Sequence, residues 1–102
     1  MFAFLEGGNY NMEQILNIPA QVICSCNISG EFTPIRFRYE TPACELITIN
    51  VLSVDSRKHQ HMRNTHEMTY VCRGQIDTNI IKTFRLRYHI ASHRWTITSI
   101  SN

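Results

Sequence analysis

Five histidines and four cysteines are the residues of this chain best suited to binding a transition metal. His59, His61 and His66 lie within eight residues and would offer three imidazoles to one ion. Cys24 and Cys26 are separated by a single residue, whereas zinc knuckles place two to four residues between their cysteines. We therefore predict no metal site and no cofactor. The three histidines stay as weaker metal candidates, and the competing interpretation is that they are solvated or contact a partner.

Nucleophilic catalysis requires a reactive side chain beside a base, and the sequence contains no motif that supplies one. A glycine-rich phosphate loop, a G-x-S-x-G turn and an H-E-x-x-H segment are all missing. Cys72 follows Met68 and Tyr70 at a spacing of two, which predicts a core-facing thiol. A nucleophilic thiol needs exposure and a lowered pKa instead. We predict that the protein is not an enzyme.

The basic residues favour recognition of phosphate or carboxylate groups. Eight of the ten are arginine, whose planar guanidinium group binds such anions bidentately. In residues 83–100 basic and apolar side chains alternate, so the cations should lie on the outer face of a strand. These outer positions, together with a basic segment in residues 55–67, give the candidate binding residues Arg36, Arg38, Arg57, Lys58, Arg63, Arg85, Arg87, His89 and Arg94.

Two functions are compatible with this pattern. The first is a non-catalytic accessory module that binds an unknown protein partner or a second copy of itself, since edge strands pair readily and small domains commonly form dimers. The alternative is a small barrel that binds single-stranded nucleic acid on its outer arginine face, provided that the second, fifth and sixth strands adjoin. The predicted inward direction of the aromatic rings argues against the alternative, as do Glu40, Glu45 and Glu67, which would neutralise part of the arginine row.

Alternation with a period of two predicts about six mostly antiparallel strands and an all-β fold, either a small barrel or a strongly rolled sheet. The expected strands cover residues 18–27, 33–40, 45–54, 68–76, 80–90 and 93–100. A long polar loop is expected at residues 55–67. No linker or repeat divides the chain, so residues 12–102 should form one small β-barrel-like domain.

The direction of individual side chains follows from the same alternation. Ile35, Phe37 and Tyr39 should point inward on the second strand. In the last hairpin, a connection at residues 91–92 places Tyr88 opposite Trp95, so that both rings face the core. The apolar positions of the third strand change phase after residue 51, which indicates a β-bulge or a strand buried on both faces.

The first eleven residues differ from the rest of the chain. They contain two glycines and three asparagine or glutamate residues without any period, and Met12 follows them directly. We expect residues 1–11 to be either upstream leader read as protein or a poorly ordered tail. The N-terminus has no basic and apolar secretory pattern, and no apolar stretch reaches the length of a membrane helix. We therefore expect a cytoplasmic protein with reduced cysteines and no contact with a membrane.

A family likeness covers residues 18–98. The segments PIRFRYE, VLSV, TYVCRGQI, FRLRYHI and RWTI occur in this order. The arrangement resembles a group of short, uncharacterised bacterial all-β proteins with a P-x-x-[FI] strand and a terminal R-W strand. The middle of the chain departs from that group, since KHQHMRNTH stands where glycines are expected. The resemblance implies a small-barrel fold and no particular activity.

Overall fold

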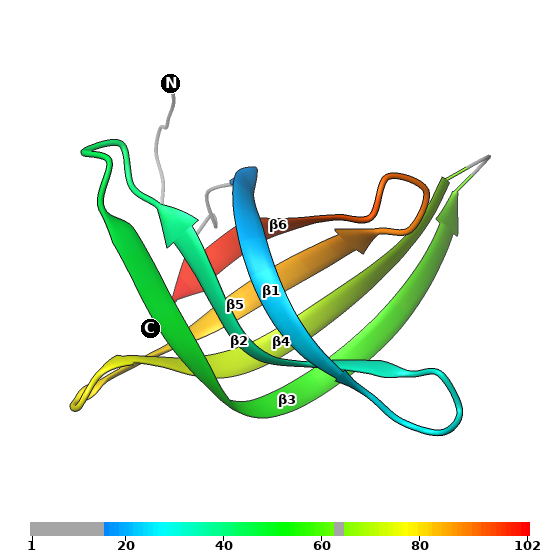
Figure 1. The fold of residues 1–102 in the computed structure, drawn as a ribbon, viewed down its shortest axis with the longest axis horizontal. Helices are drawn as coiled ribbons and strands as arrows, with labels where there is room; N and C mark the ends of the chain where they lie inside the picture. The colour runs from blue at the N-terminus through cyan, green and yellow to red at the C-terminus, as the bar shows by residue number, and fades with distance from the viewer. Residues whose placement is uncertain (1–15, 63–64) are drawn as a thin grey trace, which may run out of the picture.

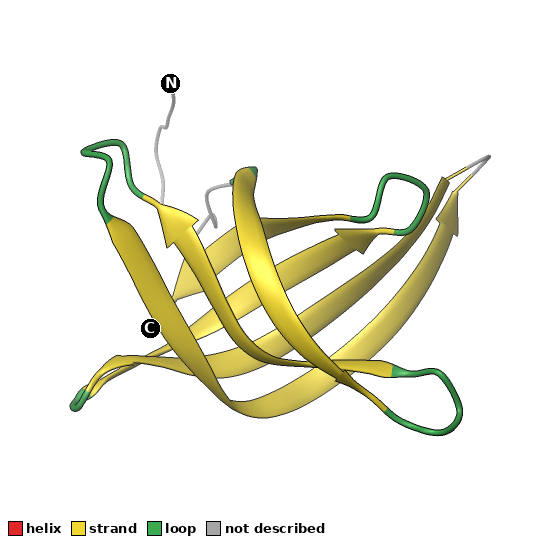
Figure 2. Ribbon diagram, viewed as in Figure 1, coloured by secondary structure: helices red, strands yellow, loops and turns green. Residues whose placement is uncertain are grey.

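The computed structural model describes residues 16–62 and 65–102. Within them, six antiparallel strands follow one another around a closed barrel, which the pairing of the first strand with the last completes (Figure 1). The strands are β1 (Ile18–Cys26), β2 (Phe32–Glu40), β3 (Leu46–Met62), β4 (Thr65–Asp77), β5 (Ile80–His89) and β6 (Arg94–Ser101). The other described residues form turns and short loops, with no helix among them (Figure 2). The predicted all-β small barrel is confirmed, while the predicted leader or tail lies outside the described residues.

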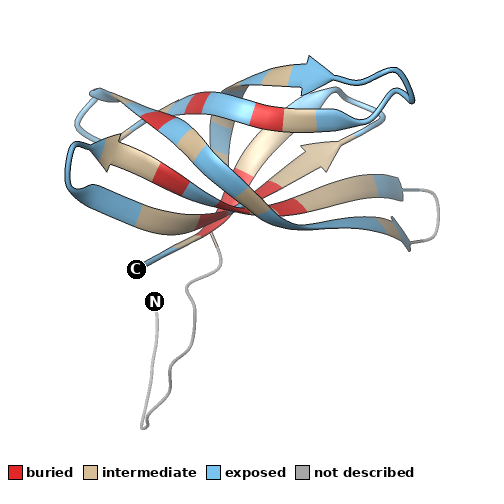
Figure 3. Cartoon of the chain, turned by 90° about the horizontal axis from the view of Figure 1, so that it is seen from below, coloured by how far each residue is buried: buried red, intermediate tan, exposed pale blue. Residues whose placement is uncertain are grey.

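The core occupies the middle of the barrel, and the ends of the hairpins are exposed (Figure 3). The rings of Phe37 and Phe84 meet edge to face across it, with their centroids 5.1 Å apart. Gly74 provides the room for this packing, because a Cβ atom there would collide with Ile49 and lie 3.1 Å from the Phe84 ring. The core cluster of buried side chains consists of Phe37, Ile49, Tyr70, Cys72, Phe84, Leu86 and Ile97. Each contributes roughly 1.5–3 kcal/mol by leaving water, which makes this layer the main source of stability.

The last hairpin has the predicted register. Tyr88 pairs with Trp95 across β5 and β6, and their ring centroids are 4.8 Å apart. Both side chains are half-buried and face the interior. The strands end at His89 and Arg94, so the connection has four residues, and His93 in it adopts a φ of 58°. The predicted alternation of rings inward and cations outward is therefore confirmed for this part of the barrel.

The predicted loop at residues 55–67 is wrong. Its described residues belong to a long hairpin in which β3 and β4 remain paired as far as Met62 and Thr65 (Figure 1). Both faces of this projecting hairpin carry polar side chains, with Arg57 and His59 on one face and Lys58 and Gln60 on the other. Hydrophobic alternation detects a strand through its apolar face, and this segment has none.

Two β-bulges determine how the side chains of β2 and β3 are directed. The predicted phase change in β3 is confirmed, because its pairing with β4 shifts between Val51 and Ser53. The prediction that Ile35 points inward is wrong, since Ile35 is 48% exposed. Its neighbour Pro34 is buried and lies opposite Cys24 on β1, where the pairing of β1 with β2 shifts register. A bulge moves the following residues to the other face, and the sequence of β2 alone does not reveal the extra residue.

Candidate functional site

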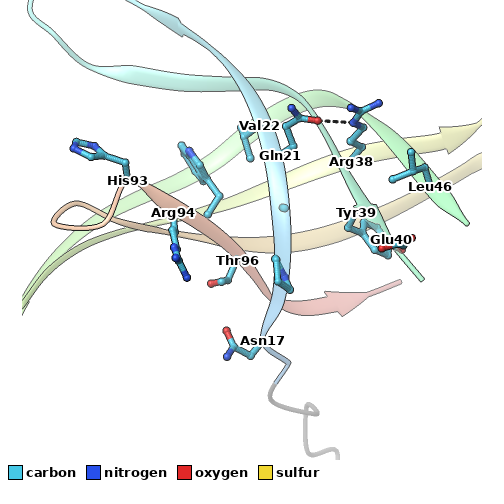
Figure 4. A pocket seen from close by; sticks show the side chains of 13 residues that line it. Asn17, Gln21, Val22, Arg38, Tyr39, Glu40, Leu46, His93, Arg94 and Thr96 are labelled. Atoms are coloured by element: carbon cyan, nitrogen blue, oxygen red, sulfur yellow. Dashed lines mark hydrogen bonds between the residues drawn. The ribbon is translucent and has the colours of Figure 1, made fainter. Parts of the chain in front are cut away.

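A groove of about 980 Å³ lies around β1, between β2 and β6 (Figure 4). It forms where β1 changes neighbour: Ile18–Ala20 pair with β6, and Gln21–Cys26 pair with β2. Tyr39 and Glu40, at the end of β2, pair with β3 and have no partner on β1 within the described residues. The sheet therefore opens at this point. The volume of the groove is typical of clefts that bind a small molecule or a short segment of polymer.

Two arginines of the predicted set line this groove on opposite sides of β1. Arg38 comes from β2, and its Nε donates a hydrogen bond to Oε1 of Gln21 at 2.5 Å. Arg94 comes from the start of β6, is exposed, and makes no side-chain hydrogen bond or ion pair with any described residue. Glu40 also lines the groove and opposes part of this positive charge. The site still has an excess of cations, which favours an anionic ligand.

Aromatic side chains line the same groove. Trp95 and Tyr39 are both half-buried and belong to its lining. Trp95 packs against Tyr70 and Tyr88, with centroid distances of 5.5 and 4.8 Å, so its ring is held in place. The hydroxyl of Tyr88 hydrogen-bonds to Nδ1 of His93 at 2.9 Å. The groove thus combines guanidinium groups with two aromatic rings, of which that of Trp95 is held by its neighbours.

A second, smaller hollow adjoins the groove. It has a volume of about 340 Å³ and shares Gln21, Val22 and Arg38 with the first. Arg36 lines it from β2, two residues before Arg38. The side chain of Arg36 is exposed and makes no side-chain hydrogen bond or ion pair with a described residue. Together the two hollows form a track across β6, β1 and β2, which we call the arginine track and define by Arg94, Arg38 and Arg36.

The predicted basic residues do not form the single surface that adjoining second, fifth and sixth strands would give. β5 and β6 are neighbours, but β1 separates β6 from β2. Arg57, on β3, already makes hydrogen bonds within the protein. Its Nη2 donates to the carbonyl of Phe32 at 3.3 Å and to Oγ1 of Thr33 at 3.0 Å. Its guanidinium carbon lies 5.6 Å from the centre of the Tyr70 ring. Arg57 therefore connects β3 to the start of β2.

Glu67 neutralises another part of the predicted set. Its carboxylate lies 3.6 Å from Nε of Arg87 and 3.0 Å from Nδ1 of His89, on the neighbouring strand β5. The Nε atom of Arg87 is buried and makes no hydrogen bond within the described structure. The predicted competition from Glu67 is confirmed. The contact with Glu67 makes the guanidinium group of Arg87 and the imidazole of His89 less available to a ligand.

The remaining predicted residues lie away from the arginine track. Lys58 is exposed on the projecting hairpin. Arg85, on β5, has an interaction within the protein, and Arg63 lies outside the described residues. Of the nine predicted binding residues, the structure therefore brings Arg36, Arg38 and Arg94 to adjoining hollows.

Two of the four thiols are shielded from ionisation by burial. Burial raises the pKa of Cys72 to about 12, so its thiol stays protonated and unreactive at neutral pH. The pKa of Cys24 is raised as well, by burial and then by Cys26. All four cysteines are free. Within residues 16–62 and 65–102, no three His, Cys, Asp or Glu side chains are placed so as to hold a metal ion.

Sequence reasoning missed Gln21, Tyr39 and Trp95 as lining residues. The two rings were assigned to the core, and they do pack against it while also lining the groove. Nothing in the sequence distinguished Gln21 as a lining residue. The missing information was the change of neighbour along β1, which single-strand alternation does not encode.

Comparison with protein families, curated proteins and solved structures found no match to this chain. The resemblance to short bacterial all-β proteins therefore stays a prediction. Among the described residues there is no helix with the length and hydropathy that a membrane crossing requires.

Proposed function

We propose that the protein is a non-catalytic binding module that takes single-stranded nucleic acid along the arginine track. The observation that carries this proposal is the convergence of Arg94, Arg38 and Arg36 on two adjoining hollows that also contain Trp95 and Tyr39. Guanidinium groups bind phosphates, and aromatic side chains stack on bases whatever their sequence. Both contacts are needed for a strand that presents phosphates and unpaired bases together.

The dimensions of the arginine track fit a short piece of such a strand. Neighbouring strands of a sheet lie about 4.8 Å apart, so the distance from β6 across β1 to β2 is on the order of 10 Å. This span suits a few nucleotides, the low end of the site sizes of small barrels. The sequence-based objection was that rings were missing from the arginine faces. It is weaker at this groove, where the sheet opens and two half-buried rings line the same space as Arg38 and Arg94.

A protein partner or a second copy of the chain is the alternative. The feature that favours it is the outer part of β3, which beyond Asn50 pairs with β4 but with no other described strand. However, β3 has two register shifts there and carries Asp55, Arg57 and Lys58. Bulges and charged residues are the means by which proteins protect exposed edges against strand addition. This edge therefore supports a partner less strongly than the arginine track supports a nucleic acid.

Binding of fluorescently labelled single-stranded DNA and RNA to the full chain, measured by anisotropy at low salt, tests the proposal. We expect the wild-type protein to bind both, and Arg38→Gln and Arg94→Gln to weaken binding severalfold. Arg73→Gln is the matched control, because Arg73 is exposed on β4 and lines neither hollow. The proposal is wrong if the wild type does not bind at low salt, or if the control loses as much affinity as the two variants of the arginine track. Sedimentation of the same samples tests the alternative of self-association.

A further inference from the structure

His93 occupies a backbone position that suits glycine better than histidine. It is the last residue of the turn between β5 and β6, and its φ of 58° lies in the left-handed region. This conformation is unfavourable for a residue with a Cβ atom, whereas glycine adopts it freely. Histidine tolerates it better than most residues, but the strain remains. A strained residue that persists beside a groove indicates that its side chain has a use there.

One nitrogen of the His93 imidazole is held by a neighbouring side chain. Nδ1 lies 2.9 Å from the hydroxyl oxygen of Tyr88 on β5, and the two ring centroids are 6.4 Å apart. The half-buried Tyr88 ring packs against Trp95 at 4.8 Å and edge to face against Phe32 at 6.0 Å. Because Tyr88 is packed on two sides, its hydroxyl holds the exposed imidazole in a defined position.

The second nitrogen of the imidazole, Nε2, makes no hydrogen bond with any described residue. When the Tyr88 hydroxyl donates to Nδ1, the single proton of a neutral imidazole is on Nε2. When the imidazole is charged, both nitrogens carry a proton and the hydroxyl oxygen accepts from Nδ1. Nε2 is a donor in both states, and an approaching anion favours them over the remaining tautomer.

His93 lines the same groove as Arg94, at the end formed by the β5–β6 turn. Although the two residues are adjacent in the chain, their side chains leave the backbone in different directions (Figure 4). The carboxylate of the groove lining, Glu40, comes from the end of β2 instead of from this turn. An anion at this end of the groove would therefore find a guanidinium group and an imidazole donor from two neighbouring residues.

We propose that His93 is a further binding residue of the groove, whose Nε2–H donates to a phosphate of the bound strand, and that Tyr88 is its positioning residue. This inference rests on the proposed binding of single-stranded nucleic acid along the arginine track. In its neutral form the imidazole adds a hydrogen bond without releasing a counterion, so the dependence of binding on salt is still determined by the arginines.

Anisotropy of a labelled single-stranded oligonucleotide, titrated with the full chain at low salt and pH 8, tests the role of His93. His93→Gly should weaken binding by at least about fivefold, because a hydrogen bond to a charged group is lost. Its Tm should stay close to that of the wild type, since glycine suits the left-handed backbone. His93→Asn should weaken binding equally, because asparagine also tolerates this conformation but has a shorter side chain. Ser92→Gly is the control: it places the same flexible residue next to His93, at an exposed position that lines neither hollow.

Two further measurements distinguish a phosphate contact from a structural role of His93. Tyr88→Phe keeps the ring and removes the hydroxyl, so it should weaken binding less than His93→Gly, and the double variant should bind no worse than His93→Gly alone. An abasic strand, which has phosphates but no bases, should show the same fold loss with His93→Gly as the normal strand.

The outcomes separate this inference from the proposed function. Wild-type affinity in either variant of His93, or an equal loss in Ser92→Gly, would overturn the role of His93 and leave the arginine track in place. A loss that is confined to the strand with bases would place His93 against a base and refute the phosphate contact. A wild-type protein that does not bind the oligonucleotide would overturn both proposals.

Discussion

The number of phosphate contacts made by the arginine track can be read from the dependence of binding on salt. Arg36, Arg38 and Arg94 are the cations that line the two hollows. For single strands the slope of log K against log salt is about −0.7 per neutralised phosphate, so three contacts predict a slope of roughly −2. Raising the salt from about 50 to 200 mM should then weaken binding roughly twentyfold. Arg38→Gln leaves two contacts, a slope of about −1.4 and a loss of roughly sevenfold over the same interval.

The assay is a fluorescence titration of wild type, Arg38→Gln and the Arg73→Gln control at four salt concentrations with the same short oligonucleotide. The control should keep the wild-type slope, since Arg73 lines neither hollow. A wild-type slope near zero would mean that binding does not depend on phosphates. A slope much steeper than −2 would mean that cations outside the arginine track take part. Either result, or an unchanged slope in Arg38→Gln, would refute the assignment of these three arginines.

Three further predictions concern the barrel that positions the track. Gly74→Ala forces a Cβ atom against the side chain of Ile49 in the core. We therefore expect the free energy of unfolding to fall by about 1–3 kcal/mol and the Tm in a thermal melt to fall by roughly 4–20 °C. An unchanged Tm would contradict this packing. Arg57→Gln should lower stability in the same assay and leave the salt slope of binding unchanged, because Arg57 is bound to Phe32. Burial raises the pKa of Cys72 from 9.0 to about 12. Between these two pH values the folded chain keeps a proton on this thiol that the unfolded chain releases. The free energy of unfolding should therefore fall as the pH rises from 9.0 towards about 12. Denaturant titrations at pH 8 and 10 should show this fall, and Cys72→Ala should reduce it.

The barrel was predictable where one face of a strand is apolar. Phe84 and Leu86 alternate with Arg85 and Arg87, and the structure buries the first pair in the core. The same alternation gave the pairing of Tyr88 with Trp95. Burial of an apolar face selects one register, because a shift by one residue would expose every ring. The alternation of apolar and basic side chains is therefore a strong local signal in the last third of the chain.

The parts that were not predictable lack such a face or depend on distant segments. The end of the β3–β4 hairpin has polar residues on both sides, so nothing in its hydrophobic pattern distinguishes it from a loop. The contact of β1 with β6 joins Ala20 to Trp95, which are far apart in the chain. The groove exists because β1 leaves β6 after Ala20 and joins β2 at Gln21. Alternation along one strand contains no information about such a change of neighbour.

The most direct test of the arginine track uses the protein's single tryptophan. Trp95 lines the same groove as Arg38 and Arg94, so a ligand that enters the groove should change its fluorescence. Addition of an unlabelled single-stranded oligonucleotide at low salt should quench this fluorescence to saturation, and Arg94→Gln should shift the titration to higher concentration. Binding that is detected by anisotropy while Trp95 fluorescence stays constant would show that nucleic acid binds elsewhere. No response in either signal would contradict nucleic-acid binding altogether.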